Sequence, residues 1–164
     1  MMKCIFLDVD GVLNSDDYQF CSGKWNMSKK SQIDPTSIPL LNQIIAATNA
    51  KIVVSSTWRI AHYDILINIL KDLGCIGEII DRTPQTHFKA KQYRHCQRGM
   101  QIQEWLTNNQ DTLLISDFVI LDDSTDMGHL SNKLVKTSML CGIQQKDVDQ
   151  AIQILNQKPE VLVL

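Results

Sequence analysis

Asp8 and Asp10 stand directly after the apolar residues 4–7 and directly before Gly11. The apolar run has the length and composition of a buried strand, and the glycine favours a turn where that strand ends. Side chains alternate along a strand, so both carboxylates could lie on one side if the strand continued through them. Paired carboxylates at the carboxyl end of a strand suit a divalent cation and phosphate chemistry. An ordinary polar turn produces the same pattern, so the rest of the chain must decide.

Two further apolar runs also end in residues suited to phosphate and metal binding. Ser55 and Ser56 end the first of them, and Asp122 and Asp123 follow the second, with Asp126 just beyond. Each ending alone is compatible with a turn or a helix cap. The carboxyl ends of parallel strands meet at one edge of a sheet, so the three endings together predict a phosphate-and-metal site there.

Strand and helix signals alternate along the chain. The predicted strands are residues 4–7, 51–55, 76–80, 118–121 and 134–137, and apolar residues at helical spacing mark helices within 38–45, 65–73, 102–106 and 148–155. This order predicts parallel pairing with right-handed crossovers, and hence an α/β protein. We expect a three-layer α/β/α sandwich around a mainly parallel, Rossmann-like sheet. It would form one domain over residues 1–164, with a short insert at about 14–34 and a basic connection at about 81–97.

The composition is that of an ordinary globular protein, with 44% hydrophobic and 21% charged residues. The net charge of −2 gives no global reason to expect nucleic acid or a membrane, so binding of a polyanion would need a local basic patch. The five cysteines are dispersed without metal-binding spacing, which favours a reducing compartment. No apolar run approaches the roughly 20 residues of a membrane span. We therefore expect a cytoplasmic location, while the apolar residues 161–164 could form an edge strand or a partner contact.

The combination of D-x-D-G-V, a strand followed by Ser-Ser-Thr-Trp-Arg, and a strand followed by Asp-Asp resembles the haloacid dehalogenase-like (HAD) superfamily of phosphohydrolases. More narrowly, nearly the whole chain is similar to the HAD domain found in Swiss Army Knife RNA-repair proteins. The positions that carry this narrower resemblance are residues 56–59, Arg98-Gly99 with Ile102, Trp105-Leu106, residues 119–123 and Gly142-Ile143.

The resemblance implies roles for the acidic residues. Asp8 would be the nucleophile that forms an aspartyl-phosphate, and Asp10 would protonate the leaving oxygen and then activate water. Mg²⁺ would be held by Asp8, by the backbone carbonyl of Asp10, and by Asp122 or Asp123. The dehalogenases of the superfamily lack an aspartate at the position of Asp10, and the P-type ATPases have threonine there. Phosphate ester hydrolysis is therefore the expected reaction.

The phosphate ligands are expected from the ends of the second strand and the loop that follows it. Ser55 would donate its hydroxyl to a phosphate oxygen, with Ser56 as the alternative donor. Either serine could instead cap the helix that follows. Arg59 could bind substrate phosphate or pair with a neighbouring carboxylate. Trp58 could stack on a base, although buried packing is the commoner role of tryptophan.

The third superfamily motif is usually a lysine, and this sequence departs from it. Arg98 is our candidate for that cation, with Lys89 and Lys91 as alternatives. These residues belong to a stretch, 87–98, in which basic residues alternate with aromatic ones and no acid occurs. Such a stretch can track a nucleic-acid backbone, and it can equally be a solvated loop.

The segments 14–34 and 81–97 are too short for a large cap domain, and an open site suits a phosphate at the end of a large molecule. The resemblance therefore implies a Mg²⁺-dependent phosphohydrolase with an aspartyl-phosphate intermediate, and together with the basic stretch 87–98 it implies phosphorylated RNA or DNA ends as the substrate. A small-molecule or nucleotide phosphatase is the alternative within the same class. A catalytically weak, metal-binding regulatory module is the alternative from another class.

Overall fold

The computed structural model describes residues 1–22 and 32–157 and is built on one five-stranded sheet. All strand pairs are parallel, and the order across the sheet is β3-β2-β1-β4-β5. The strands are β1 (Met2–Leu7), β2 (Lys51–Val54), β3 (Ile79–Arg82), β4 (Ile115–Asp122) and β5 (Leu134–Lys136). Because β1 is central and every strand runs the same way, all carboxyl ends lie along one edge.

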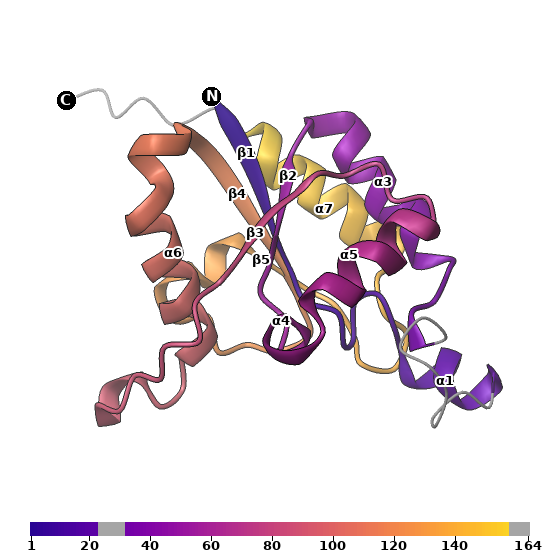
Figure 1. The fold of residues 1–164 in the computed structure, drawn as a ribbon, viewed down its shortest axis with the longest axis horizontal. Coiled ribbons are helices and arrows are strands. Elements are labelled where there is room, and N and C mark those ends of the chain that lie inside the picture. The colour runs from indigo at the N-terminus through magenta and orange to yellow at the C-terminus, as the bar shows by residue number, and fades with distance from the viewer. Residues whose placement is uncertain (23–31, 158–164) are drawn as a thin grey trace.

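Helices cover both faces of this sheet, which confirms the predicted three-layer α/β/α architecture. They are α1 (Asp16–Ser22), α3 (Ser37–Thr48), α4 (Trp58–Ala61), α5 (Tyr63–Asp72), α6 (Gln97–Leu113) and α7 (Gln145–Asn156), with 3₁₀ turns η1 (Lys91–Tyr93) and η2 (Gly128–Lys133). Figure 1 shows α6 on one side of the sheet and α3, α5 and α7 on the other.

The side chains of β1 alternate between two hydrophobic cores. Cys4 and Phe6 pack with α6, where the ring of Phe6 meets that of Trp105 edge to face at 5.4 Å. Ile5 and Leu7 pack with the helices of the opposite face. All four strand residues are fully buried, as expected of a central parallel strand, so its register is fixed on both sides.

Two details of the predicted elements are wrong. The third strand begins at Ile79 rather than at residue 76, because it is an edge strand that pairs only with β2 and does not need a continuous apolar run. Ile65, which we counted among the apolar markers of α5, is 48% exposed, while the buried face of that helix is formed by Leu66, Ile69 and Leu70.

The predicted insert at 14–34 begins with α1, and its residues 23–31 lie outside the described part of the chain, as does the apolar tail at 161–164. The connection between β3 and α6 contains only the short η1 turn. Neither segment has the length of a large cap domain. Within residues 1–22 and 32–157, no helix is both long and apolar enough to cross a membrane. All five cysteines are free thiols.

Candidate active site

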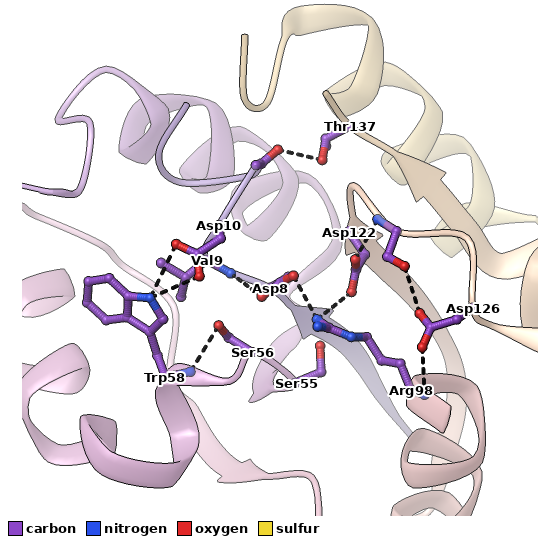
Figure 2. Close-up of polar contacts among 12 residues, drawn as sticks. Asp8, Val9, Asp10, Ser55, Ser56, Trp58, Arg98, Asp122, Asp126 and Thr137 are labelled. Atoms are coloured by element: carbon purple, nitrogen blue, oxygen red, sulfur yellow. Dashed lines mark hydrogen bonds and ion pairs between the residues drawn. The ribbon is translucent and has the colours of Figure 1, made fainter. Parts of the chain in front are cut away.

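The carboxyl edge of the sheet brings together the residues that follow β1, β2 and β4. The amide of Asp8 donates to the carbonyl of Leu121 at 3.0 Å, and the amide of Ser55 donates to that of Leu7 at 2.9 Å. The strand ladders therefore extend to the first residues of the site. Asp122 is the last residue of β4 and is fully buried. Figure 2 shows Asp8, Ser55 and Asp122 converging from their three strands.

Asp8, Asp122 and Asp123 form an acidic cluster. Each offers a carboxylate oxygen, and these oxygens lie within 4.8 Å of one another. Gly11 makes this approach possible: it has a φ of +72°, and a Cβ at this position would lie 2.7 Å from both Cβ and Cγ of Asp123. The glycine of the D-x-D-G motif thus serves both the turn and the space beside Asp123.

Arg98 is the cation that the fold brings to this cluster. Its Nη1 lies 2.7 Å from Oδ2 of Asp8 and 2.7 Å from Oδ2 of Asp122. Burial lowers the pKa of Arg98, but the nearby carboxylates raise it above its ordinary value, so the guanidinium stays charged. Lys89 and Lys91, the two alternatives, are exposed side chains in the preceding loop.

The acidic cluster carries more negative charge than Arg98 neutralises. Burial, and then the charge of Asp8, raise the pKa of Asp122 to about 7, and the same two causes raise the pKa of Asp123. When all three carboxylates are ionised, one guanidinium leaves an excess of two negative charges. Clustered carboxylate oxygens with that excess fit a hard divalent cation such as Mg²⁺.

The carboxylate of Asp10 lies apart from the cluster and is held by two side-chain donors. The indole N–H of Trp58 donates to both of its oxygens at 3.2 and 3.3 Å, and Nδ2 of Asn14 donates to Oδ1 at 2.8 Å. The Oδ1 of Asn14 in turn accepts from the amide of Gly11 at 3.0 Å. Figure 2 shows the indole of Trp58 at the carboxylate of Asp10. Trp58 and Asn14 are both almost completely buried, so the orientation of Asp10 is fixed by the core.

The hydroxyl groups of Ser55 and Ser56 have different environments, which distinguish phosphate binding from helix capping. The hydroxyl oxygen of Ser56 accepts from the amide of Trp58 at 3.2 Å, which is helix-start chemistry. The Ser55 hydroxyl is buried and has no hydrogen-bond partner among the described residues. In Figure 2 it points toward the side of the site where Asp8 and Arg98 meet. A buried hydroxyl without a partner is costly unless a ligand supplies one.

Arg59 contacts backbone carbonyls and one side-chain amide, not the phosphate or the carboxylate that the sequence predicted. It is only 4% exposed, and its five N–H donors are all engaged. The acceptors are the backbone carbonyls of Ser55, Ser56, Thr83 and Pro84 and the side-chain oxygen of Gln101. We therefore correct the expectation of a phosphate or carboxylate partner: Arg59 ties the loop after β2 to the chain after β3, and so holds Ser55 in place.

Thr137 and Asp126 are further positioning residues, whose hydrogen-bond partners could not be predicted from the sequence. The Thr137 hydroxyl donates to the carbonyl of Gly11 at 2.7 Å. Asp126 accepts from the backbone amide of Arg98 at 3.2 Å and from the hydroxyl of Ser124 at 2.9 Å. The only signal for Asp126 is its place just after the Asp-Asp pair. These bonds fix the turn after β1 and the start of α6 relative to the acidic cluster.

Gly99 allows the start of α6 to pack closely against the loop after β4. We predict that Gly99→Ala lowers the stability of the fold. A Cβ at this position would overlap the backbone carbonyl of Met127, so the first turn of α6 must shift and carry Arg98 with it. We expect the free energy of unfolding to fall by about 2–3 kcal/mol, measured by urea denaturation. Asn108→Ala, at an exposed position of the same helix, is the matched control and should change it by less than about 0.5 kcal/mol. Equal effects of the two substitutions would contradict this account.

The parallel α/β sheet, with an acidic cluster and a half-buried arginine at its carboxyl edge, defines a HAD-like hydrolase domain. The family model described as "HAD domain in Swiss Army Knife RNA repair proteins" matches residues 4–148, and the chain belongs to this family. Comparisons with curated proteins and with solved structures give no match. Membership of the family implies a phosphohydrolase-type function.

Proposed function

We propose that the protein is a Mg²⁺-dependent phosphatase that forms an aspartyl-phosphate on Asp8 and acts on phosphorylated RNA ends. The observation that carries the proposal is the position of Asp8. The residue is only 4% exposed, its carboxylate lies beside those of Asp122 and Asp123, and it contacts Arg98 at 2.7 Å. A carboxylate is ionised at neutral pH, so it needs neighbouring positive charge rather than a base to act as a nucleophile toward a phosphate.

In the first step an oxygen of Asp8 attacks phosphorus, and the bond from phosphorus to the ester oxygen breaks. Oδ1 of Asp8 accepts from the amide of Val9 at 2.7 Å, which orients the carboxylate. Asp10 gives a proton to the departing oxygen, so that the alcohol leaves neutral. Arg98 and the Ser55 hydroxyl donate to the phosphate oxygens, where negative charge increases in the transition state.

In the second step water attacks the phosphorus of the aspartyl-phosphate. Asp10, now ionised, accepts the proton of that water, inorganic phosphate leaves, and the carboxylate of Asp8 is regenerated. Trp58 and Asn14 hold Asp10 by hydrogen bonds in the geometry that both proton transfers use. The two transfers are opposite in direction, so Asp10 ends the cycle in its starting state.

Asp8, one or both of Asp122 and Asp123, and the backbone carbonyl of Asp10 would hold Mg²⁺. The ion, when bound, neutralises negative charge on the phosphate and on the nucleophile. The excess negative charge and the raised pKa of Asp122 support this assignment, because burial and the charge of Asp8 disfavour the ionised form of Asp122 and a bound cation would favour it.

The proposed substrate class rests on the family and on the lengths of the segments after β1 and β3. The matching family is that of a HAD domain in RNA repair proteins, and neither segment has the length of a large cap domain, which favours a phosphate at the end of a large molecule. A purified-protein assay should compare RNA and DNA oligonucleotides phosphorylated at either end, free nucleotides and an aryl phosphate, with Mg²⁺ and with a chelator. We expect Mg²⁺-dependent release of phosphate, with kcat/KM for RNA ends at least about 10-fold above that for nucleotides. A preference for nucleotides would favour the small-molecule alternative, and metal binding without phosphate release would favour a regulatory module.

Without metal, we expect Asp122 to make stability fall as the pH rises from 3.8 toward about 7. The folded state holds the proton of Asp122 more tightly than the unfolded chain does, so unfolding releases a proton and a higher pH favours it. Urea denaturation of the wild type and of Asp122→Asn across this pH range isolates the contribution of Asp122 to the free energy of unfolding, since the amide does not titrate. Mg²⁺ should raise the unfolding midpoint of the wild type near neutral pH and that of the variant much less. Equal Mg²⁺ effects on the two proteins would exclude Asp122 as a ligand.

A further inference from the structure

The segment between β3 and α6 carries a concentration of positive charge that the net charge of the chain does not suggest. No acidic residue lies between Arg82 and Glu104. The exposed basic or titratable side chains of this segment are His87, Lys89, Lys91, Arg94 and His95. Two lysines outside this segment pair with acids: Lys51 with Glu78 and Lys133 with Asp117. Within the described part of the chain, the lysines and Arg94 of this segment make no ion pair.

This segment is held in a defined shape by the first turns of α6. The side-chain amide of Gln97 accepts from the backbone N–H of Phe88 at 3.0 Å and donates to the carbonyls of Phe88 at 2.7 Å and Tyr93 at 2.9 Å. Gln101 donates to the carbonyl of Thr86 at 2.9 Å. The rings of Phe88 and Tyr93 meet edge to face at 5.7 Å. The basic side chains therefore project from a built loop, residues 86–95, which we term the basic loop.

The basic loop is anchored beside the candidate active site. Gln97 and Gln101, which bind the loop, flank Arg98, whose guanidinium contacts Asp8. Gln101 also accepts from Arg59, the residue that holds the loop of Ser55. Figure 1 shows the chain around η1 projecting past the lower end of α6, at the carboxyl edge of the sheet. A chain whose end occupies the site can thus continue along this loop.

We propose that the basic loop binds the phosphate backbone of a single-stranded RNA whose terminal phosphate lies at Asp8; the proposal rests on the proposed function. Unpaired lysine and arginine side chains beside a phosphate site match the spaced negative charges of a nucleic acid. The half-buried rings of Phe88 and Tyr93 offer apolar surface on which a base can stack. An acidic peptide would use the charges but not the rings, which is why we favour RNA.

The test compares Lys89→Gln/Lys91→Gln with Lys71→Gln/Lys146→Gln, which removes the same charge from exposed positions on α5 and α7. The substrates are an end-phosphorylated RNA of roughly ten nucleotides and an aryl phosphate. We expect the kcat/KM of the loop variant on RNA to fall about 10-fold. On the aryl phosphate its kcat/KM should fall by about twofold or less. The logarithmic salt dependence on RNA should become shallower by about 1.4, for two contacts to a single strand. The control variant should change neither value.

Equal losses on both substrates, or an equal loss in the control variant, would overturn the proposal. If the wild type released phosphate from RNA and the loop variant did so equally well, the loop proposal would fail while the proposed function stood. If the wild type released phosphate from no substrate, the proposed function would fail. Fluorescence anisotropy with the same RNA would then test the loop alone: weaker binding by the loop variant only would support it. Equal binding by the two variants, or tighter binding of polyglutamate than of RNA, would overturn it.

Discussion

Replacing Asp8 with asparagine is expected to lower turnover of an aryl phosphate by at least about 10⁴-fold. The amide has nearly the same size and can still accept from the Val9 amide, a contact of 2.7 Å in the wild type. It cannot attack phosphorus, because its oxygen carries no negative charge. The loss should appear in kcat rather than in KM, since Ser55 and Arg98 remain to bind the phosphate. Steady-state hydrolysis in Mg²⁺ measures both constants.

Two controls separate this loss from damage to the fold. Arg98 keeps its contact with Asp122 in the variant, so circular dichroism and the urea midpoint should show a folded protein. Asp149→Asn makes the same chemical change at an exposed position of α7 and should leave turnover within about twofold of the wild type. Wild-type turnover by folded Asp8→Asn would exclude the aspartyl-phosphate mechanism.

The acidic cluster and Ser55 could be predicted to lie together because strand topology alone brings them together. Once β1, β2 and β4 are parallel neighbours, the residues after their last apolar positions must meet at one edge. That argument needs only the apolar runs and the polar residues that end them. It predicted correctly that Asp8, Asp122 and Asp123 lie close together. For the same reason the fold class was accessible, since alternating elements allow few arrangements.

The partners of the polar side chains could not be predicted, because they depend on packing between distant segments. The sequence gives no sign that the indole of Trp58 meets Asp10, or that Arg59 meets four backbone carbonyls rather than a phosphate. Asn14 could have been suspected, as a polar residue that closes the turn after D-x-D-G. The start of the edge strand β3 could not be predicted for the same reason. Its pairing with β2, rather than its own hydrophobicity, determines where it begins.

Asp10→Asn should leave the first step with an aryl phosphate nearly intact and slow the second by about 10²–10⁴-fold. An aryloxide with a stabilised negative charge departs without a proton, so it does not need Asp10 as an acid. Water attacking the aspartyl-phosphate does need a base, and asparagine is none. Stopped-flow assays should therefore show a burst of aryloxide close to one equivalent per protein, followed by slow turnover. With an RNA end, whose alkoxide needs the proton, the variant should show no burst.

Trp58→Phe is the matched test of how Asp10 is held. Phenylalanine keeps an aromatic ring against His62, whose ring lies 6.0 Å from that of Trp58, but it removes the N–H that reaches both oxygens of Asp10. Asn14 still donates at 2.8 Å, so we expect the second step to slow by only about 10-fold, with a smaller burst. A single-turnover assay with isolated phosphorylated protein measures that step directly. If phosphorylated Asp10→Asn released phosphate at the wild-type rate, Asp10 would not be the base of the second step, and the hydrogen bond from Trp58 would have only a structural role.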